Sequence, residues 1–285
     1  MTRGWFFFLA ILGAAPAFGQ ERPFKVESPA LLDVGRVQVN VGVEFLHRQR
    51  YSLSGLQGDL MRLGVTNIRV GVGEYAEFQI SGVMRDFLTV AKRTPPVIAP
   101  TFTGDSTGDF GDLVLGAKFK LAGEKKARPA IGFQFAVQLP NASNESGLGN
   151  DETGFFARVL LAKQLGRAQV LGNLGLAILG SPVQANSQAD MLTYGFGFLM
   201  PLRQNLELAA EIQGREGPAR IGNETLAQVM VGTRLRFGSW HGDVAGVAGL
   251  RPYSPAFGIL IGVTYDFQAF HRTGEPKTIR PGTGK

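Results

Sequence analysis

The side chains of this chain that could take part in chemistry are mainly charged ones, because nucleophiles and metal ligands are scarce. The sequence of 285 residues has no cysteine and three histidines, His47, His241 and His271. None of the histidines stands beside a serine, and a hydrolase would need both groups together with an orienting polar residue. Without cysteine or a histidine cluster, no metal site and no cofactor is expected. The sequence therefore predicts no enzymatic activity.

Charged residues recur along one side of short segments whose other side is apolar. In residues 36–45, Arg36 and Glu44 share one parity while valines and a phenylalanine hold the other. Residues 257–267 alternate in the same way, with bulky apolar side chains at every odd position and Leu260 as the one large apolar residue at an even position. Because successive side chains of a strand point to opposite faces, each segment has one apolar and one more polar face.

Segments of this kind recur along the chain and have the length of a membrane-crossing strand, about 9–11 residues. Single-chain bacterial outer-membrane barrels have an even number of strands. The sequence therefore predicts an all-β fold, an antiparallel transmembrane β-barrel of about 12 strands. The segment at 240–250 is rich in glycine and is the least regular of the set. The expected strands are residues 36–45, 60–72, 77–85, 112–121, 131–139, 155–163, 168–178, 192–198, 205–213, 228–237, 240–250 and 257–267.

The connections between these segments support the same architecture. Short links follow the even-numbered segments, and longer, polar or Pro/Gly-rich links mostly follow the odd-numbered ones, among them residues 46–59 and 86–110. Short periplasmic turns that alternate with longer extracellular loops are typical of outer-membrane barrels. Both chain ends are then expected in the periplasm. The link at 86–110, with its prolines, is a candidate gate or lid at the barrel mouth.

A soluble β-sandwich or barrel also alternates, but with its apolar face inward. Two features favour the membrane barrel over it. Aromatic residues gather near the strand ends, with Trp240, Tyr265 and Phe267 at one rim and Phe45 and Phe257 at the other, as in interfacial girdles. The opposite face is rich in glycine and in charges of both signs, which suits an aqueous or ion-paired lumen.

The charged face of each segment would point into the lumen of such a barrel. Its charges nearly balance, so we expect most of them to pair, because a charge in a narrow barrel needs a partner. If a conduction path exists, the candidates to line it are Lys118 with Lys120, and Arg234 with Arg236, since each pair projects from a single strand. The predicted lumen-lining residues are Arg36, Glu44, Arg69, Glu77, Arg85, Lys118, Lys120, Arg158, Glu207, Glu211, Arg234, Arg236 and Asp243.

The ends of the chain indicate export. A basic residue, a short apolar run and a small-residue exit predict a signal peptide at residues 1–19. We expect residues 20–34 to form a periplasmic segment, residues 35–267 the barrel in the outer membrane, and residues 268–285 a basic periplasmic tail. The net charge of +6 is too modest for a nucleic-acid-binding surface.

Two stretches carry a resemblance to a known family. Residues 108–119 read Gly-Asp-Phe-Gly-Asp-Leu-Val-Leu-Gly-Ala-Lys-Phe, and residues 133–141 read Phe-Gln-Phe-Ala-Val-Gln-Leu-Pro-Asn. Together they resemble the outer-membrane β-barrel proteins of the MetA-pathway of phenol degradation family. The Thr-Gly-Asp part of that family's strand exit is replaced here by Asn-Ala-Ser at 141–143. The resemblance implies an outer-membrane barrel that lets small hydrophobic or aromatic compounds through.

The last strand also resembles the signal that the outer-membrane assembly machinery recognises. Gly262, Tyr265 and Phe267 fill its glycine and aromatic places, whereas Leu260 stands where a polar residue is usual. The expected partners are thus outer-membrane lipid, that machinery and a small-molecule solute. We expect a channel or diffusion-facilitating transporter for small, hydrophobic or aromatic molecules. The alternatives are a plugged barrel with a structural or binding role, and a lipid hydrolase at the rim.

Overall fold

The computed structural model describes residues 24–218 and 220–271, and every regular element in these ranges is a β-strand. No helix in this part of the chain is long and apolar enough to cross a membrane. The strands are β1 (Arg36–Tyr51), β2 (Leu56–Gly71), β3 (Ala76–Arg93), β4 (Ser106–Asp109), β5 (Leu113–Ala122), β6 (Ala130–Leu139), β7 (Gly154–Leu165), β8 (Ala168–Gly180), β9 (Gln188–Pro201), β10 (Leu206–Glu216), β11 (Leu226–Phe237), β12 (Trp240–Gly249) and β13 (Phe257–Gln268).

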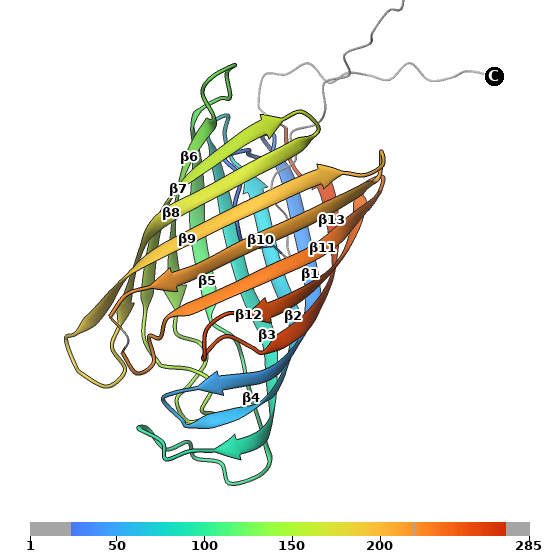
Figure 1. The fold of residues 1–285 in the computed structure, drawn as a ribbon. Coiled ribbons are helices and arrows are strands. Elements are labelled where there is room, and N and C mark those ends of the chain that lie inside the picture. Colours follow the sequence, from blue (N-terminus) through green and yellow to red (C-terminus); the bar gives the residue numbers. More distant parts are fainter. Residues whose placement is uncertain (1–23, 219, 272–285) are drawn as a thin grey trace, which may run out of the picture.

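Twelve of these strands form a closed antiparallel barrel (Figure 1). Each strand pairs with its neighbours in the chain, and the ring closes where β1 pairs with β13, from Arg36 opposite Gln268 to His47 opposite Phe257. The short β4 stands outside the ring and pairs with β3 alone. The predicted all-β, 12-strand antiparallel barrel is confirmed, including the glycine-rich strand β12, which pairs on both sides.

The last strand shows why alternating sequences fold in this way. On β13 the odd-numbered residues face outward, and Ile261 and Val263 are 51% and 48% exposed. Its even-numbered residues face inward, and Leu260 and Thr264 are 3% and 1% exposed. Leu260, the exception to the polar parity, packs in an apolar cluster inside the barrel. The outer face is thus apolar and suited to lipid, while the inner face mixes polar and apolar side chains.

The two ends of the barrel differ in their connections. One end, here called the turn end, carries the links 72–75, 123–129, 166–167, 202–205 and 238–239 together with the first residue of β1 and the last of β13. The opposite end, here called the loop end, carries most of the longer links. Figure 1 shows the turn end at the top and the projecting ends of β1, β2 and β3, with β4, at the bottom.

Two predicted loops are partly strand. The link expected at residues 46–59 is reduced to residues 52–55, because β1 and β2 continue their pairing beyond the ring. The link expected at residues 86–110 likewise contains the outer half of β3 and all of β4. Polar side chains in these stretches concealed the strands, since strands that project from a barrel no longer need an apolar face toward lipid.

A β-bulge at Gly64 changes which side chains face the lumen. The pairing of β1 with β2 skips this residue, since Gly42 pairs with Val65 and Val43 with Leu63. Gly64 has a φ of 61°, in the left-handed region that favours glycine. A bulge inserts one residue into the alternation, so the parity of inward side chains differs on its two sides.

We predict that Gly64→Ala weakens the barrel. An L-residue at this φ costs about 1–2 kcal/mol, so the free energy of unfolding in a urea titration should fall by about that amount. The control is Gly246→Ala on β12, where an added Cβ meets nothing within 4 Å and no unusual φ is required. An equal loss of stability in both variants would contradict the role of the bulge.

Candidate functional site: the barrel lumen

Most of the predicted lumen-lining charges do lie inside the barrel. Arg158 is half-buried and donates to Gln134, and Arg36 pairs with Asp266 near the turn end. Lys120 is exposed and Arg236 half-buried, both close to the turn end. The predicted residues that are buried are Glu44, Arg69, Glu77, Lys118, Glu207, Glu211, Arg234 and Asp243.

Arg85 was predicted to face the lumen, and this is wrong. Its guanidinium lies 5.6 Å from the ring centroids of Phe87 and Phe110, which are both exposed. On β3 the buried residues Val83 and Asp86 are three positions apart, so the parity changes between them. A sequence analysis that assumes constant alternation cannot detect this change of parity.

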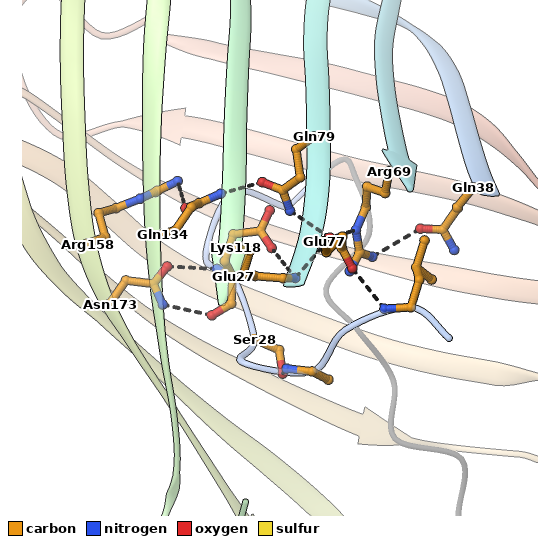
Figure 2. Close-up of polar contacts among 12 residues, drawn as sticks. Glu27, Ser28, Gln38, Arg69, Glu77, Gln79, Lys118, Gln134, Arg158 and Asn173 are labelled. Atoms are coloured by element: carbon orange, nitrogen blue, oxygen red, sulfur yellow. Dashed lines mark hydrogen bonds and ion pairs between the residues drawn. The ribbon is translucent and has the colours of Figure 1, made fainter. Parts of the chain in front are cut away.

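The best-connected group of charges is centred on Glu77, which is fully buried (Figure 2). Arg69 donates to both of its carboxylate oxygens, at 2.7 and 2.9 Å, and Lys118 Nζ lies 3.4 Å from Oε1. Arg69 also donates to Gln38. A bidentate arginine with a second cation satisfies a buried carboxylate that would otherwise be costly. Lys118, predicted as a candidate for a conduction path, is instead held in this group.

A chain of amides extends this group around the wall. Gln79 donates to Glu77 and accepts from Gln134, and Gln134 in turn accepts from Arg158 at 2.6 Å. Figure 2 shows these side chains projecting from adjacent strands toward one another. Together with the Glu77 group, the amides link six strands through side chains, namely β1, β2, β3, β5, β6 and β7.

A second group of charges lies on the loop-end side of the bulge, and the sequence predicted only one of its three members. Arg62 donates to Glu44 and to Asp86, each at 3.1 Å. Arg62 was not among the predicted lumen residues because the bulge at Gly64 shifts its parity. Asp86 was not among them because it belonged to the link predicted at residues 86–110. The glycine inside an otherwise alternating strand was the available signal.

A third group lies on the opposite wall. Arg234 pairs with Glu207 at 3.0 Å, and both side chains are buried. Asn40 donates to Thr264 at 2.8 Å and lies 3.4 Å from Asp243. Some of the lumen charges are thus held in pairs of opposite sign, while Arg158 and Glu211 are held by an amide and by backbone N–H groups.

Residues 24–34 occupy the lumen, whereas the sequence placed them in a periplasmic segment before the barrel. The backbone N–H groups of Lys25 and Val26 donate to the Glu211 carboxylate, at 2.9–3.0 Å. Glu27 and Asn173 exchange two hydrogen bonds, at 2.7 and 2.8 Å. The segment forms no strand, so side chains of the wall satisfy backbone groups that a sheet would otherwise pair.

The same segment joins the group around Glu77. Glu27 lies 3.2 Å from Lys118 Nζ, and the N–H of Leu32 donates to Glu77 at 2.9 Å. In Figure 2 the segment runs across the interior between the strands that carry Asn173 and Glu77. It therefore spans the lumen from one wall toward the other.

The wall is shaped to receive this segment. Phe24 and Val26 are 3% and 1% exposed and belong to a buried apolar cluster with side chains from several strands. A Cβ added at Gly195 or Gly197 would lie 2.8 or 3.2 Å from the Val26 side chain, and one at Gly132 would lie 3.1 Å from Pro29. Glycines thus provide the space that the segment fills.

The loop end is covered mainly by residues 140–153. Asp109 accepts from the N–H and the hydroxyl of Ser143, each at 2.8 Å, and Asp112 accepts from the N–H groups of Asn141 and Ala142. Farther along, the Gly147 carbonyl accepts from Ser54 at 2.7 Å. Since Ser54 lies in the turn between β1 and β2, this loop extends over the rim from β6.

Residues 94–105, in the link predicted as a gate or lid, pack beside that loop. The N–H groups of Val97 and Ile98 donate to the Leu53 carbonyl, and the N–H of Thr101 donates to the Glu145 carbonyl. Phe102 packs on the apolar cluster formed by Leu56, Leu60 and Leu88 at the projecting strands. The two loops together form the cover of the loop end.

Two of the histidines lie at opposite ends of the described barrel, His47 at the loop end and His241 near the turn end. Nδ1 of His47 lies 2.7 Å from Asp59 and its ring stacks on Phe257, and no serine completes this pair among the described residues. His241 is buried in the lumen, and His271 lies at the end of the described range. The same residues include no group of three side chains that could hold a metal ion.

We predict that Glu77→Gln strongly destabilises the barrel. The variant leaves Arg69 and Lys118 buried with one carboxylate fewer, and breaking a buried ion pair on one side costs about 3–5 kcal/mol. Urea unfolding would measure the loss. Glu145→Gln, on the exposed surface of the loop end, serves as the matched control and should change stability by less than about 0.5 kcal/mol.

We further predict that Asp109→Asn loosens the loop at 140–153. Partial burial works against ionisation of Asp109, but hydrogen bonds from Ser146 and Ser143 outweigh it and hold the pKa of its carboxyl below the ordinary value. These bonds therefore stabilise fully above about pH 4 and are lost as the pH falls below it. At neutral pH, endoproteinase Glu-C should cleave after Glu145 faster in Asp109→Asn than in the wild type. The exposed Asp105→Asn is the control, and equal rates in the two variants would refute the clamp.

Comparison with solved structures identifies the same fold in outer-membrane proteins. The COG4313 outer membrane channel from Pseudomonas putida F1 superposes with a TM-score of 0.59 at 15% identity, over 83% of this chain and 97% of that chain. The translocator domain of autotransporter NalP from Neisseria meningitidis gives a TM-score of 0.49 at 13% identity, over 81% and 88%. At 15% identity, the feature that this chain has in common with the Pseudomonas putida channel is the fold.

At the level of sequence, no curated protein shows a significant match. The family described as "MetA-pathway of phenol degradation" matches residues 20–211, which include the N-terminal segment and the barrel strands through most of β10. Together with the closed 12-strand barrel, this match shows that the chain is an outer-membrane β-barrel protein that belongs to the MetA-pathway of phenol degradation family.

Proposed function

We propose that this protein is a passive outer-membrane channel for small hydrophobic or aromatic molecules, and that residues 24–34 close it at rest. The observation that carries the proposal is that an extended chain segment fits inside the lumen and contacts opposite walls. A lumen of that width, once vacated, would admit a small molecule. The family's connection with phenol degradation, and the description of the Pseudomonas putida protein as a channel, agree with this function.

The way in which the segment is held favours a removable plug. Its anchors include backbone N–H groups bonded to Glu211, Asn173 and Glu77, the ion pair of Glu27, and the packing of two apolar side chains. None of these contacts belongs to the strand pairing that closes the ring. The segment can leave while every wall strand keeps both neighbours.

The orientation and assembly of the barrel follow from the same proposal. We place the turn end, which carries the first residue of β1 and the last of β13, in the periplasm, and the covered loop end outside the cell. The plug then enters from the periplasmic side. The last strand, with Gly262, Tyr265 and Phe267, would be the part that the outer-membrane assembly machinery recognises.

Two other functions remain as alternatives. A permanently plugged barrel with a structural or binding role would have the same resting structure. A lipid hydrolase at the rim would need a nucleophile beside a histidine, and His47 has Asp59 and Phe257 as its neighbours instead. We infer that the protein is not an enzyme.

A reversible tether tests the plug directly, because the chain has no cysteine of its own. A Cβ at position 197 lies 3.4 Å from Val26 Cβ, close to the separation of about 3.5–4.5 Å in disulfides. In planar bilayers, we predict that oxidised Val26→Cys/Gly197→Cys stays closed and that a reductant restores the openings of the wild type.

The two single-cysteine variants are the controls and should not respond to oxidation or reduction. Equal conductance of the oxidised and reduced double variant would show that the segment does not block the path. Absence of conductance in both forms, and in a variant whose residues 24–33 are replaced by a Gly/Ser linker, would favour the permanently plugged barrel.

A further inference from the structure

A cavity of about 200 Å³ lies at the loop end, separate from the plug. It is bounded by the end of β1 and its turn, by the loop at 140–153, by the ends of β8 and β10, and by residues 222–224. At about 30 Å³ for the share of one water in the liquid, its volume equals roughly seven waters. A ligand with a single ring and one polar group is of suitable size.

The cations of this cavity have fewer partners than its acids. Arg215 uses Nε to donate to the Glu224 carbonyl at 2.9 Å, and the charge of the Glu224 carboxylate also acts on it. Its two terminal nitrogens form no hydrogen bond with a described residue. Arg50, on the same lining, is exposed and its guanidinium forms no ion pair with a described residue. A guanidinium presents donors in a fork that matches a carboxylate.

Two of the three acids that line the cavity are already engaged. Glu224 accepts from the Ser52 hydroxyl and from the N–H of Gly222. Asp112 accepts from Gln138 and from backbone N–H groups of the loop at 140–153. The third acid, Glu152, has no hydrogen bond from a described residue and remains a source of negative charge on the lining.

The remainder of the lining supplies an apolar surface. Leu53 and Leu179 are buried beside the cavity, and Leu148 lies on the covering loop. Tyr51 also lines the cavity, and its side chain packs on the apolar cluster formed by Leu56, Leu60 and Leu88. Apolar walls with a few convergent donors are typical of small-molecule sites.

We propose that this cavity binds a small monocarboxylate with an aromatic or short apolar body. The carboxylate lies against Arg215, with Arg50 at the entrance, and the apolar body lies against Tyr51 and the leucines. Glu152 repels a second negative charge, which limits the ligand to one carboxylate. As an entry site for the proposed channel, the cavity rests on that function and narrows its substrate class to organic acids.

Benzoate is the probe, and benzyl alcohol, with the same ring and no charge, is its neutral counterpart. Saturation-transfer NMR titrations on the full-length protein in detergent micelles would give both affinities. We expect benzoate to bind more tightly than benzyl alcohol, and Arg215→Met to weaken benzoate by about tenfold or more, as for a charge-assisted hydrogen bond. Arg215→Lys keeps the charge but loses the fork of donors, so its affinity for benzoate should lie between those of the wild type and Arg215→Met.

Glu152→Gln is the matched variant, because it removes a negative charge from the lining where Arg215→Met removes a positive one. It should tighten benzoate several-fold and permit phthalate, a dicarboxylate, to bind. Equal affinities for benzoate and benzyl alcohol, or an unchanged benzoate affinity in Arg215→Met with wild-type urea stability, would overturn the proposal. These titrations do not depend on conductance, so a result that overturns the benzoate site would leave the proposed channel function untouched. A protein that shows no conductance but still binds benzoate would instead be a binding protein.

Discussion

Hydrocarbon offers no partner to a backbone N–H or C=O group, and the pairing of β1 with β13 is the contact that meets this constraint. That pairing runs from Arg36 to His47 on one strand and leaves neither strand with an open edge inside the ring. The outer surface must then be apolar, so the polar side chains of every strand are directed into the lumen. The chemistry of this protein is consequently the chemistry of its interior.

A lumen filled with charges creates a second requirement, because buried carboxylates need donors. The wall supplies part of them, as Arg69 and Lys118 do for Glu77. Residues 24–34 supply the rest through backbone N–H groups, which reach Glu77 and Glu211. The dependence is mutual, since an extended segment without a strand partner needs acceptors for its own backbone. The plug and the polar wall are therefore two halves of one hydrogen-bonded system.

The sequence was most informative where one rule applied without interruption. Alternation identified all twelve strands of the ring, because lipid on one side enforces the period of two. It failed at Gly64, where one residue inserted into β2 reverses the parity and brings Arg62 into the lumen. On the neighbouring β3 the parity also changes, between Val83 and Asp86, and Arg85 lies outside the lumen.

The plug was beyond prediction because it depends on contacts between distant parts of the chain. Residues 24–34 have no alternation, and the bonds of Val26 with Glu211 join positions 185 apart in the sequence. Local traces lie on β9, where Gly195 and Gly197 occupy two successive inward positions, and on β6 at Gly132. Glycines at such positions are common in barrels, so they do not indicate a plug until the contact with the Val26 side chain is known.

The two closures of the barrel differ in how they can open. The cover at the loop end is bound by carboxylates of Asp109 and Asp112 to loop backbone, and it encloses the cavity that Arg215 lines. The plug is bound by the same kind of contact, since its own N–H groups donate to carboxylates of the wall. When the plug leaves the lumen, about ten residues regain backbone conformational entropy, worth roughly 1 kcal/mol or more for each residue. Water can then hydrate Glu211 and Asn173. Such a segment belongs to the low-stability end of local opening, whereas the wall strands, each paired on both sides, open only with the whole barrel. A ligand that occupies the outer cavity first would therefore meet a closure that fluctuates open on its own.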